Sequence, residues 1–235
     1  MTPNGDISDA GPESAVVDGC RVLGTQDVGD PVWGHVSLRD PDGRGAWIKA
    51  GPLGFDEVGA DDVVLIDFDG NVLAGKHRVP LEYPLHTEVL RLRGDVNSVV
   101  HTHPPYSIAL GASGRQLQVF SNAAGPFAGG VPRYTRAVGL IDSAELGAEL
   151  ADCLGGAAAA LMTGHGVVTA GASVGAAVTT AVLLERACHL QLTVVAAGGL
   201  DPSLAEPGDR YRHTTSEQYL LRTWEYLLRT AGRSA

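Results

Sequence analysis

Cysteine, positive charge and uninterrupted apolar runs are all scarce in this chain of 235 residues, and each shortage excludes a class of protein. The three cysteines, Cys20, Cys153 and Cys188, are scattered and contain no Cys-x-x-Cys pair, which favours reduced thiols in a cytoplasmic protein. There are 17 Lys and Arg against 27 Asp and Glu, so the sequence argues against nucleic acid or an anionic membrane surface as a partner. The most apolar segment, residues 174–198, contains charged side chains and predicts a buried helix, not a membrane span.

The organisation of the chain predicts one domain, because no repeat, low-complexity tract or shift in composition divides it. Residues 1–14 are rich in Pro, Gly, Asp and Ser and do not resemble a signal peptide. We expect a flexible leader there and a domain over 15–235. Hydrophobic periodicity predicts strands at 36–39, 46–49, 63–67, 72–73, 99–103, 137–141, 157–163 and 167–169, and helices at 15–26, 83–93, 106–111, 143–154, 173–197 and about 214–229. Strands mixed with helices and joined by short turns predict an α/β fold with a mixed, largely antiparallel central sheet.

A pair of histidines follows the apolar run Val99-Val100, with one residue between them. Side chains repeat with period two along a strand, so His101 and His103 are expected to project to the same face. Two adjacent imidazoles make half of a first-row metal site, whereas buried neutral imidazoles without partners would be costly. A His-x-His pair alone remains a weak signal, because many such pairs are exposed and idle.

Two further residues extend this pair to a full ligand set. Glu88 lies on the helix that leads to the histidine strand, and His165 lies between two glycines at the end of another apolar strand. Each alone has an ordinary explanation, as a solvated helix residue or as an imidazole bonded to a carbonyl. Together with the pair they give three imidazoles and a carboxylate, the set of an open catalytic metal site.

Four motifs, taken together, resemble the class II aldolase/adducin domain family. They are Gly-His-Val-Ser-Leu-Arg (34–39), His-Thr-Glu (86–88), Asp-Val-Asn-Ser-Val-Val-His-Thr-His (95–103) and Gly-His-Gly (164–166), and the resemblance runs from about Gly34 to Gly198. It implies a single-domain α/β/α sandwich and a homotetramer with its active site at a subunit interface.

The same resemblance implies one divalent metal ion per subunit, held by His101, His103 and His165, with Glu88 as fourth ligand or acid/base. Zn²⁺, Mn²⁺, Fe²⁺ and Co²⁺ all suit that set. A cytoskeletal branch of the family, similar to adducin, lacks the ligands. Because all four positions are filled here, a non-catalytic scaffold is the weaker alternative.

Three motif positions depart from the family's sugar-phosphate aldolases, which hold a phosphate with small hydroxyl and glycine positions. His35 follows the first glycine, the next loop reads Lys49-Ala50-Gly51-Pro52, and His86-Thr87 precede Glu88. Proline removes an amide donor that a phosphate would need, whereas His35, His86 or Lys49 can hold a carboxylate. We therefore expect His35, Lys49, Gly51 and Thr87 to contact an anionic small-molecule substrate. Phe120 stands near the position of the aldolases' proton-donating tyrosine and cannot replace it.

These departures favour the family's metal-dependent decarboxylases over its aldolases. The predicted reaction is decarboxylation of a hydroxylated aromatic or heteroaromatic carboxylate through a metal-stabilised enolate-type intermediate. Glu88, His86 or a residue of a neighbouring subunit is expected to be the catalytic acid. The alternatives are an aldolase or epimerase acting on a sugar phosphate such as a ketose 1-phosphate, an iron-dependent oxygenase on the same fold, and the metal-free scaffold.

Overall fold

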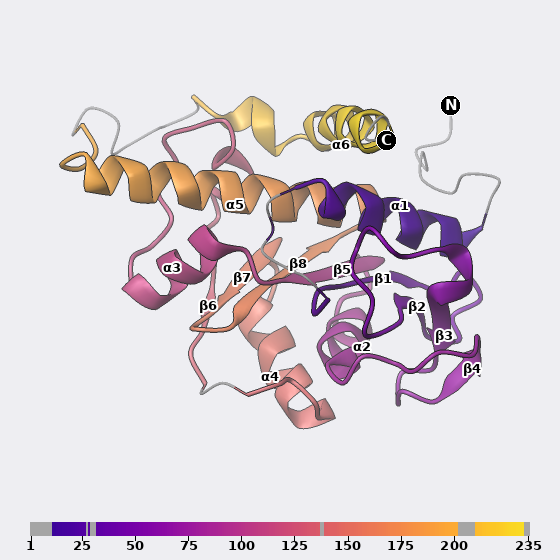
Figure 1. Cartoon of the computed structure of the whole chain (residues 1–235). Helices are drawn as coiled ribbons and strands as arrows, with labels where there is room; N and C mark the ends of the chain where they lie inside the picture. Colours follow the sequence, from indigo (N-terminus) through magenta and orange to yellow (C-terminus); the bar gives the residue numbers. More distant parts are fainter. Residues whose placement is uncertain (1–10, 27, 29–31, 137–138, 202–209, 233–235) are drawn as a thin grey trace.

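An eight-stranded sheet forms the centre of the molecule in the computed structural model, which describes residues 11–26, 28, 32–136, 139–201 and 210–232 (Figure 1). The strands are β1 (His35–Arg39), β2 (Ala46–Lys49), β3 (Val63–Ile66), β4 (Val72–Ala74), β5 (Ser98–Thr102), β6 (Arg133–Tyr134), β7 (Ala159–Met162) and β8 (Gly166–Gly171). Their order is β4-β3-β2-β1-β5-β8-β7-β6. Every neighbouring pair is antiparallel except β6 and β7, so the sheet is mixed and largely antiparallel, as predicted.

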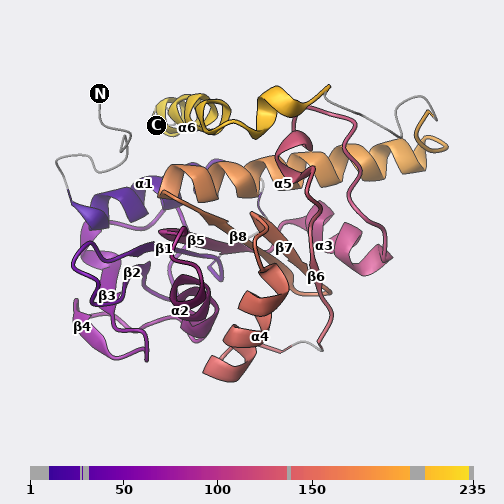
Figure 2. The ribbon, with the colours of Figure 1, turned by 180° about the vertical axis from the view of Figure 1, so that it is seen from behind.

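Helices cover both faces of this sheet, and the two opposite views in Figures 1 and 2 show the same three layers. The helices are α1 (Pro12–Gly24), α2 (Tyr83–Leu92), α3 (Pro105–Ser113), α4 (Ala144–Leu154), α5 (Val174–Ala196) and α6 (Glu217–Ala231), with short 3₁₀ turns η1 (Ala60–Asp62), η2 (Gly125–Phe127) and η4 (Arg212–Thr215). Helices α1 and α5 lie on one face with α6 outside them, and α2 and α4 lie on the other. The predicted α/β/α sandwich is confirmed.

Alternation along the central strands divides the core between the two faces. Val36 and Val100 point into the cluster formed with α1, α5 and α6, whereas Val99 and Val168 point into the cluster formed with α2 and α4. The period-two repeat therefore sends His35 and His101 toward the α2 face as well. That face carries the candidate site.

Several boundaries differ from the predictions, and three of them concern the two terminal helices and the strand that carries His101. Helix α1 begins at Pro12, inside the expected leader, because proline is well suited to the first turn of a helix. The C-terminal helix begins at Glu217, where Ser216 caps it, and the preceding turn is 3₁₀. Strand β5 ends at Thr102, so His103 lies just beyond it. Residues 137–138 of the predicted strand 137–141 are outside the described residues, and residues 139–141 do not form a strand, so that prediction is wrong for its described part. Among the described helices, none has both the length and the apolar character needed to cross a membrane.

Candidate metal centre

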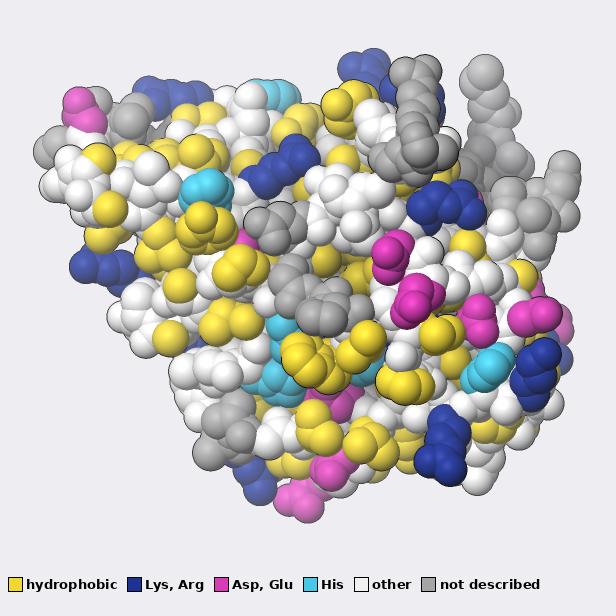
Figure 3. Space-filling model, in the orientation of Figure 1, with side chains coloured by type: hydrophobic (Ala, Val, Ile, Leu, Met, Phe, Trp, Pro, Cys, Tyr) yellow, Lys and Arg dark blue, Asp and Glu magenta, His cyan; other side chains and the backbone are white. Residues whose placement is uncertain are grey.

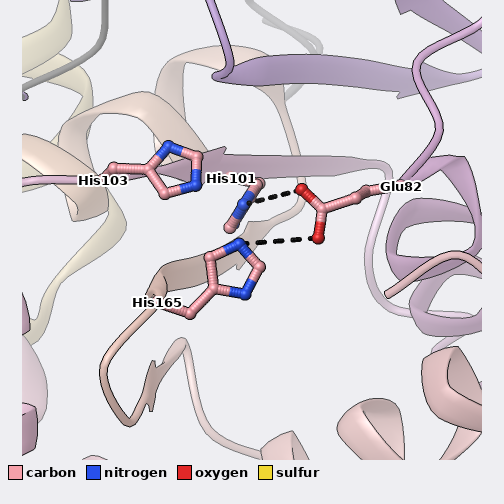
Figure 4. Close-up of side chains that lie close together, drawn as sticks. All are labelled: Glu82, His101, His103 and His165. Carbon is pink, nitrogen blue, oxygen red and sulfur yellow. Dashed lines mark ion pairs between the residues drawn. The ribbon is translucent and has the colours of Figure 1, made fainter. Parts of the chain in front are cut away.

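Glu82, His101, His103 and His165 converge at the end of β5, and Figure 4 shows their side chains facing one another. One donor atom from each of the four lies within 4.8 Å of every other. The ring centroid of His101 lies 4.6 Å from that of His103 and 5.1 Å from that of His165. Three separated segments of the chain therefore supply one cluster: the start of α2, the end of β5, and the turn between β7 and β8.

Strand pairing fixes the position of His101, and a hydrogen bond to a backbone carbonyl fixes its tautomer. Its neighbours across the sheet are His35 on β1 and Val168 on β8. Nδ1 lies 2.8 Å from the carbonyl oxygen of Val167. Because a carbonyl can only accept, Nδ1 carries the proton, and Nε2 of the neutral ring presents a lone pair to the cluster. A backbone contact of this kind orients metal-binding histidines.

Glycines on both sides of His165 allow its turn to approach β5 closely. Gly164 has a φ of +72°, a conformation that favours glycine. A Cβ on Gly166 would lie 2.5 Å from the carbonyl oxygen of Thr102 and 3.0 Å from Cδ2 of His103. The two glycines of the Gly-His-Gly motif therefore allow the turn to place His165 beside the β5 histidines.

The carboxylate of the cluster belongs to Glu82, the residue before the first turn of α2. Oε2 lies 3.4 Å from Nε2 of His101, and Oε1 lies 3.5 Å from Nε2 of His165. The backbone N–H of Ile141 donates to Oε1 at 2.9 Å. Burial raises the pKa of Glu82, but contacts with His101 and His165 and the bond from Ile141 outweigh it, so its pKa falls below the ordinary value. The carboxylate is therefore held in its charged form.

The donor atoms of the cluster fit a bound cation. The lone pair on Nε2 of His101 faces a charged carboxylate oxygen at 3.4 Å, and this buried nitrogen has no hydrogen bond. Two acceptors that face each other repel unless a proton or a metal ion lies between them, so the pair favours a positive charge at this position. Three imidazoles and one carboxylate are also the donors that first-row divalent metals use in open catalytic sites.

Glu88, the predicted carboxylate ligand, is not part of the cluster, and this assignment is corrected to Glu82. The two residues are six positions apart, which turns the side chain through roughly 240° around a helix. Glu88 points toward α4: its Cγ packs so closely against that helix that a Cβ added to Gly147 would lie only 2.9 Å from it. The carboxylate of Glu88 pairs with Arg91 at 3.3 Å. The missed signal was Pro84, which marks the start of the helix and places Glu82 at its N-cap.

Two further histidines, His35 and His86, lie beside the cluster. The ring of His35 stacks on His101 with centroids 5.9 Å apart, and that of His86 lies 5.7 Å from His35. His86 is wholly buried and its Nδ1 contacts Oγ of Ser37 at 2.8 Å. Burial, with the neighbouring imidazoles, lowers the pKa of both, to about 3 for His86, so both are neutral at physiological pH. The catalytic role of His86 and the substrate-binding role of His35 remain predictions.

The other predicted substrate contacts, Lys49, Gly51 and Thr87, have partners or positions within the protein itself. Lys49 is fully buried with its ammonium over the ring of Phe55, and it donates to the carbonyl oxygen of Ala50 at 3.3 Å. Gly51 donates its N–H to the carbonyl of Arg78, and Thr87 is buried inside α2. The roles of Lys49, Gly51 and Thr87 in substrate binding stay predictions.

An exposed tryptophan that no sequence motif singles out borders the cluster. The ring of Trp33 is 62% exposed and meets His103 edge to face, with centroids 6.4 Å apart. Figure 3 shows histidine side chains reaching the surface near the middle of this face, with hydrophobic side chains around them. The exposed Trp33 ring therefore gives the cluster an apolar border beside His103.

Comparison with known proteins agrees with this geometry. Residues 14–192 match the family described as "Class II Aldolase and Adducin N-terminal domain". The chain belongs to the class II aldolase/adducin family. It is 37% identical over 207 residues to a 3,4-dihydroxyphthalate decarboxylase of Arthrobacter keyseri, covering 82% of each chain. It is 33% identical over 201 residues to a second such decarboxylase, from Rhodococcus jostii, covering 80% of this chain and 82% of that one.

The solved structures agree on the class II aldolase fold. A crystal structure of an aldolase II superfamily protein from Pseudomonas syringae superimposes with a TM-score of 0.84 at 24% identity and covers 98% of this chain and 96% of the other. At that identity the likeness concerns the fold alone. The decarboxylase relatives place the chain with the decarboxylase-like branch of the class II aldolase family and indicate a lyase.

Proposed function

We propose that this protein is a metal-dependent decarboxylase of a hydroxylated aromatic carboxylate, with 3,4-dihydroxyphthalate as the first compound to test. The observation that carries the proposal is the cluster of Glu82, His101, His103 and His165, in which an imidazole lone pair faces a carboxylate at 3.4 Å. The decarboxylases named above, at 33–37% identity over most of the chain, support the reaction type and the substrate class.

The proposed reaction is redox-neutral. The bond between the ring carbon and the carboxylate carbon breaks, CO₂ leaves, and the electron pair stays on the ring until a proton from solvent replaces the lost group. A divalent ion in the cluster would bind vicinal oxygens of the substrate and withdraw electron density while that bond breaks. The contribution of the protein is to hold the four donors, to orient the substrate and to limit access of water.

Orientation of the substrate falls to the residues around the cluster. We assign the carboxylate of the substrate to His35, whose ring stacks on His101 and whose buried Nδ1 has no hydrogen-bond partner. His86 is wholly enclosed behind it, so its proposed role is to support the His35 ring. The exposed face of Trp33 supplies a flat apolar wall beside His103 for the aromatic ring.

The identity of the metal ion, the oligomeric state and the location of the enzyme are also proposals. We propose Zn²⁺, Mn²⁺, Fe²⁺ or Co²⁺ as the ion, one per subunit, and metal analysis with reconstitution of the metal-free protein decides among them. A homotetramer with the site at a subunit interface is proposed from the family resemblance, and light scattering tests it. A cytoplasmic location is proposed from the three scattered cysteines.

Release of CO₂ by the purified, metal-loaded protein tests the proposed reaction. We expect decarboxylation of 3,4-dihydroxyphthalate, with no comparable cleavage of ketose 1-phosphates. His103→Ala should abolish both the bound metal and the activity. Release of dihydroxyacetone phosphate from a ketose 1-phosphate at useful rates would contradict the proposal in favour of an aldolase. Turnover that requires oxygen would indicate an oxygenase, and a wild-type protein that binds no metal would indicate a scaffold.

A further inference from the structure

The first turn of α3 begins directly after His103-Pro104, and its N-cap residue is a proline without a capping side chain. Helices leave the N–H groups of their first turn without partners inside the helix. Pro105 has no N–H, and Ile108 donates to the carbonyl oxygen of Pro104 at 3.0 Å. The N–H groups of Tyr106 and Ser107 therefore need acceptors from elsewhere in the protein.

Glu185, in the middle of α5, supplies both acceptors. Oε1 accepts the N–H of Tyr106 at 2.8 Å, and Oε2 accepts the N–H of Ser107 at 2.8 Å and its hydroxyl at 2.7 Å. The residue is 7% exposed, so these bonds form away from bulk water. A carboxylate at a helix N-terminus also benefits from the helix dipole. Glu185 therefore caps α3 from a different helix.

This cap lies next to His103, the member of the cluster that follows the end of β5. His101 is held inside β5 by pairing with β1 and β8, but β5 ends at Thr102. The path of the backbone at His103 is fixed on one side by the strand and on the other by Pro104 and the start of α3. Anchoring α3 to α5 therefore fixes the second end of the segment that carries the His103 ring.

We propose that Glu185 is a positioning residue for the metal centre, which acts through the start of α3 to hold His103 in place. This inference rests on the proposed metal site but not on the identity of the substrate. A buried carboxylate that bonds two backbone N–H groups, three and four residues after His103, goes beyond what packing of α5 against α3 requires. Loss of the Glu185 carboxylate should therefore disturb the ligand geometry by more than its effect on stability explains.

The test is Glu185→Gln, measured by titration of the metal-free protein with Co²⁺ and by thermal unfolding of the same metal-free protein. Glutamine keeps the shape of the side chain but has a single acceptor oxygen, so one N–H of α3 loses its partner. We expect Co²⁺ affinity to fall about tenfold, with a weakened or altered visible spectrum, since the loss of supporting contacts typically costs a metal site about 10- to 100-fold. Ser107→Ala, which leaves both backbone bonds to Glu185, should change the affinity less than threefold.

The matched control is Gln191→Ala on the same helix. Gln191 is 2% exposed and ties α5 to a loop through Gln118 and Gln116, at 2.6 and 2.7 Å. Its loss should lower the unfolding temperature of the metal-free protein as much as Glu185→Gln does, while Co²⁺ affinity stays within twofold of wild type. Equal loss of affinity in both variants, or wild-type affinity in Glu185→Gln, would overturn the proposal.

A second readout does not need the metal. In metal-free protein with ¹³C-labelled histidine, Glu185→Gln should broaden or shift the imidazole signals of His103 while those of His101 remain. If the wild-type protein bound no Co²⁺, the metal-site proposal would fail, and this spectrum would still decide whether Glu185 positions His103. Unchanged His103 signals would refute that role.

Discussion

Glu82 and Glu88 lie on the same short segment, yet only Glu82 faces the cluster. Glu82→Gln should weaken divalent-metal affinity at least about 100-fold, because the charged ligand is lost. The unfolding temperature of the metal-free protein should not fall, since the new amide can donate to the lone pair of His101. Metal titration and calorimetry measure the two effects.

Glu88→Gln is the matched control for that change. It removes a half-exposed ion pair with Arg91 at 3.3 Å, which contributes little to stability. Metal affinity should remain at the wild-type level. If Glu88→Gln lost the metal and Glu82→Gln retained it, the assignment of the carboxylate would have to be reversed.

Trp33 offers a separate prediction about the substrate. Trp33→Leu should raise KM for the aromatic acid about five- to tenfold with little change in kcat, because a stacking surface contributes about 1 kcal/mol of binding. Steady-state kinetics measure both constants. Trp224→Phe, at a buried tryptophan in the α1-side core, is the control and should leave KM unchanged. An unchanged KM in Trp33→Leu would mean that the ring binds elsewhere.

At the scale of single residues, the sequence predicted three of the four cluster members. The sequence could predict His101, His103 and His165 because a strand pattern and a glycine-flanked turn determine where their side chains point. Glu82 was missed because the side of a helix that faces the sheet depends on where the helix starts. Trp33 and Glu185 were missed for another reason, since their roles depend on contacts between distant parts of the chain.

The turn between β7 and β8 is the element on which the position of His165 depends. Gly166→Ala should cost about 2–4 kcal/mol and weaken metal binding, because its Cβ would lie 2.5 Å from the backbone oxygen of Thr102. Urea unfolding and metal titration check the two effects. Gly156→Ala, where nothing lies within 4 Å of the added Cβ, is the control and should change the free energy of unfolding by less than about 0.5 kcal/mol.

The hairpin between β1 and β2 depends on Asp40. Its carboxylate accepts two bonds from the Arg44 side chain at 2.8 Å and one from Nε1 of Trp47 at 2.9 Å. The hydrogen bonds from Arg44 lower its pKa from 3.8 to about 2. A lowered pKa stabilises the fold at pH values above the unfolded-state pKa, and this contribution is lost as the pH falls from about 4 to about 2.

Asp40→Asn tests that dependence. The variant should be less stable than wild type by about 1 kcal/mol at pH 7, because Arg44 is half exposed and solvent screens the pair. The difference should shrink as urea unfolding is repeated from pH 4 down to pH 2. Asp42→Asn, at an exposed carboxylate 3.4 Å from Arg44, should show no such trend. A constant difference between Asp40→Asn and wild type would contradict the assignment.

At the scale of elements, the fold followed from periodicity, and its details did not. Alternating or β-branched runs predicted the central strands β1, β2, β3, β5, β7 and β8, and amphipathic spacing predicted α2 and α4. Ser143 and Ser173 cap α4 and α5 with their side chains, in agreement with the helices predicted over 143–154 and 173–197. The two-residue β6 and the end of β5 at Thr102 carried no local signal, because they depend on pairing with strands distant in the sequence.

For the whole molecule, bound metal should behave as a stabilising ligand. A divalent ion present at 100 times its dissociation constant should raise the free energy of unfolding by about 2.7 kcal/mol. Calorimetry with and without a chelator measures this increase in the wild-type protein. His103→Ala should unfold at the same temperature in both conditions. An equal stabilisation of His103→Ala would place the ion elsewhere.

The register between β1, β5 and β8 has a consequence for refolding. His101 faces the cluster only when it pairs with His35 on one side and Val168 on the other. A slip of β5 by one residue would turn the His101 imidazole toward α1 and leave a protein unable to bind the ion. Metal added during refolding would therefore favour the native register, because it binds and stabilises only the correctly paired molecules. Molecules with the wrong register bind no ion and remain free to rearrange.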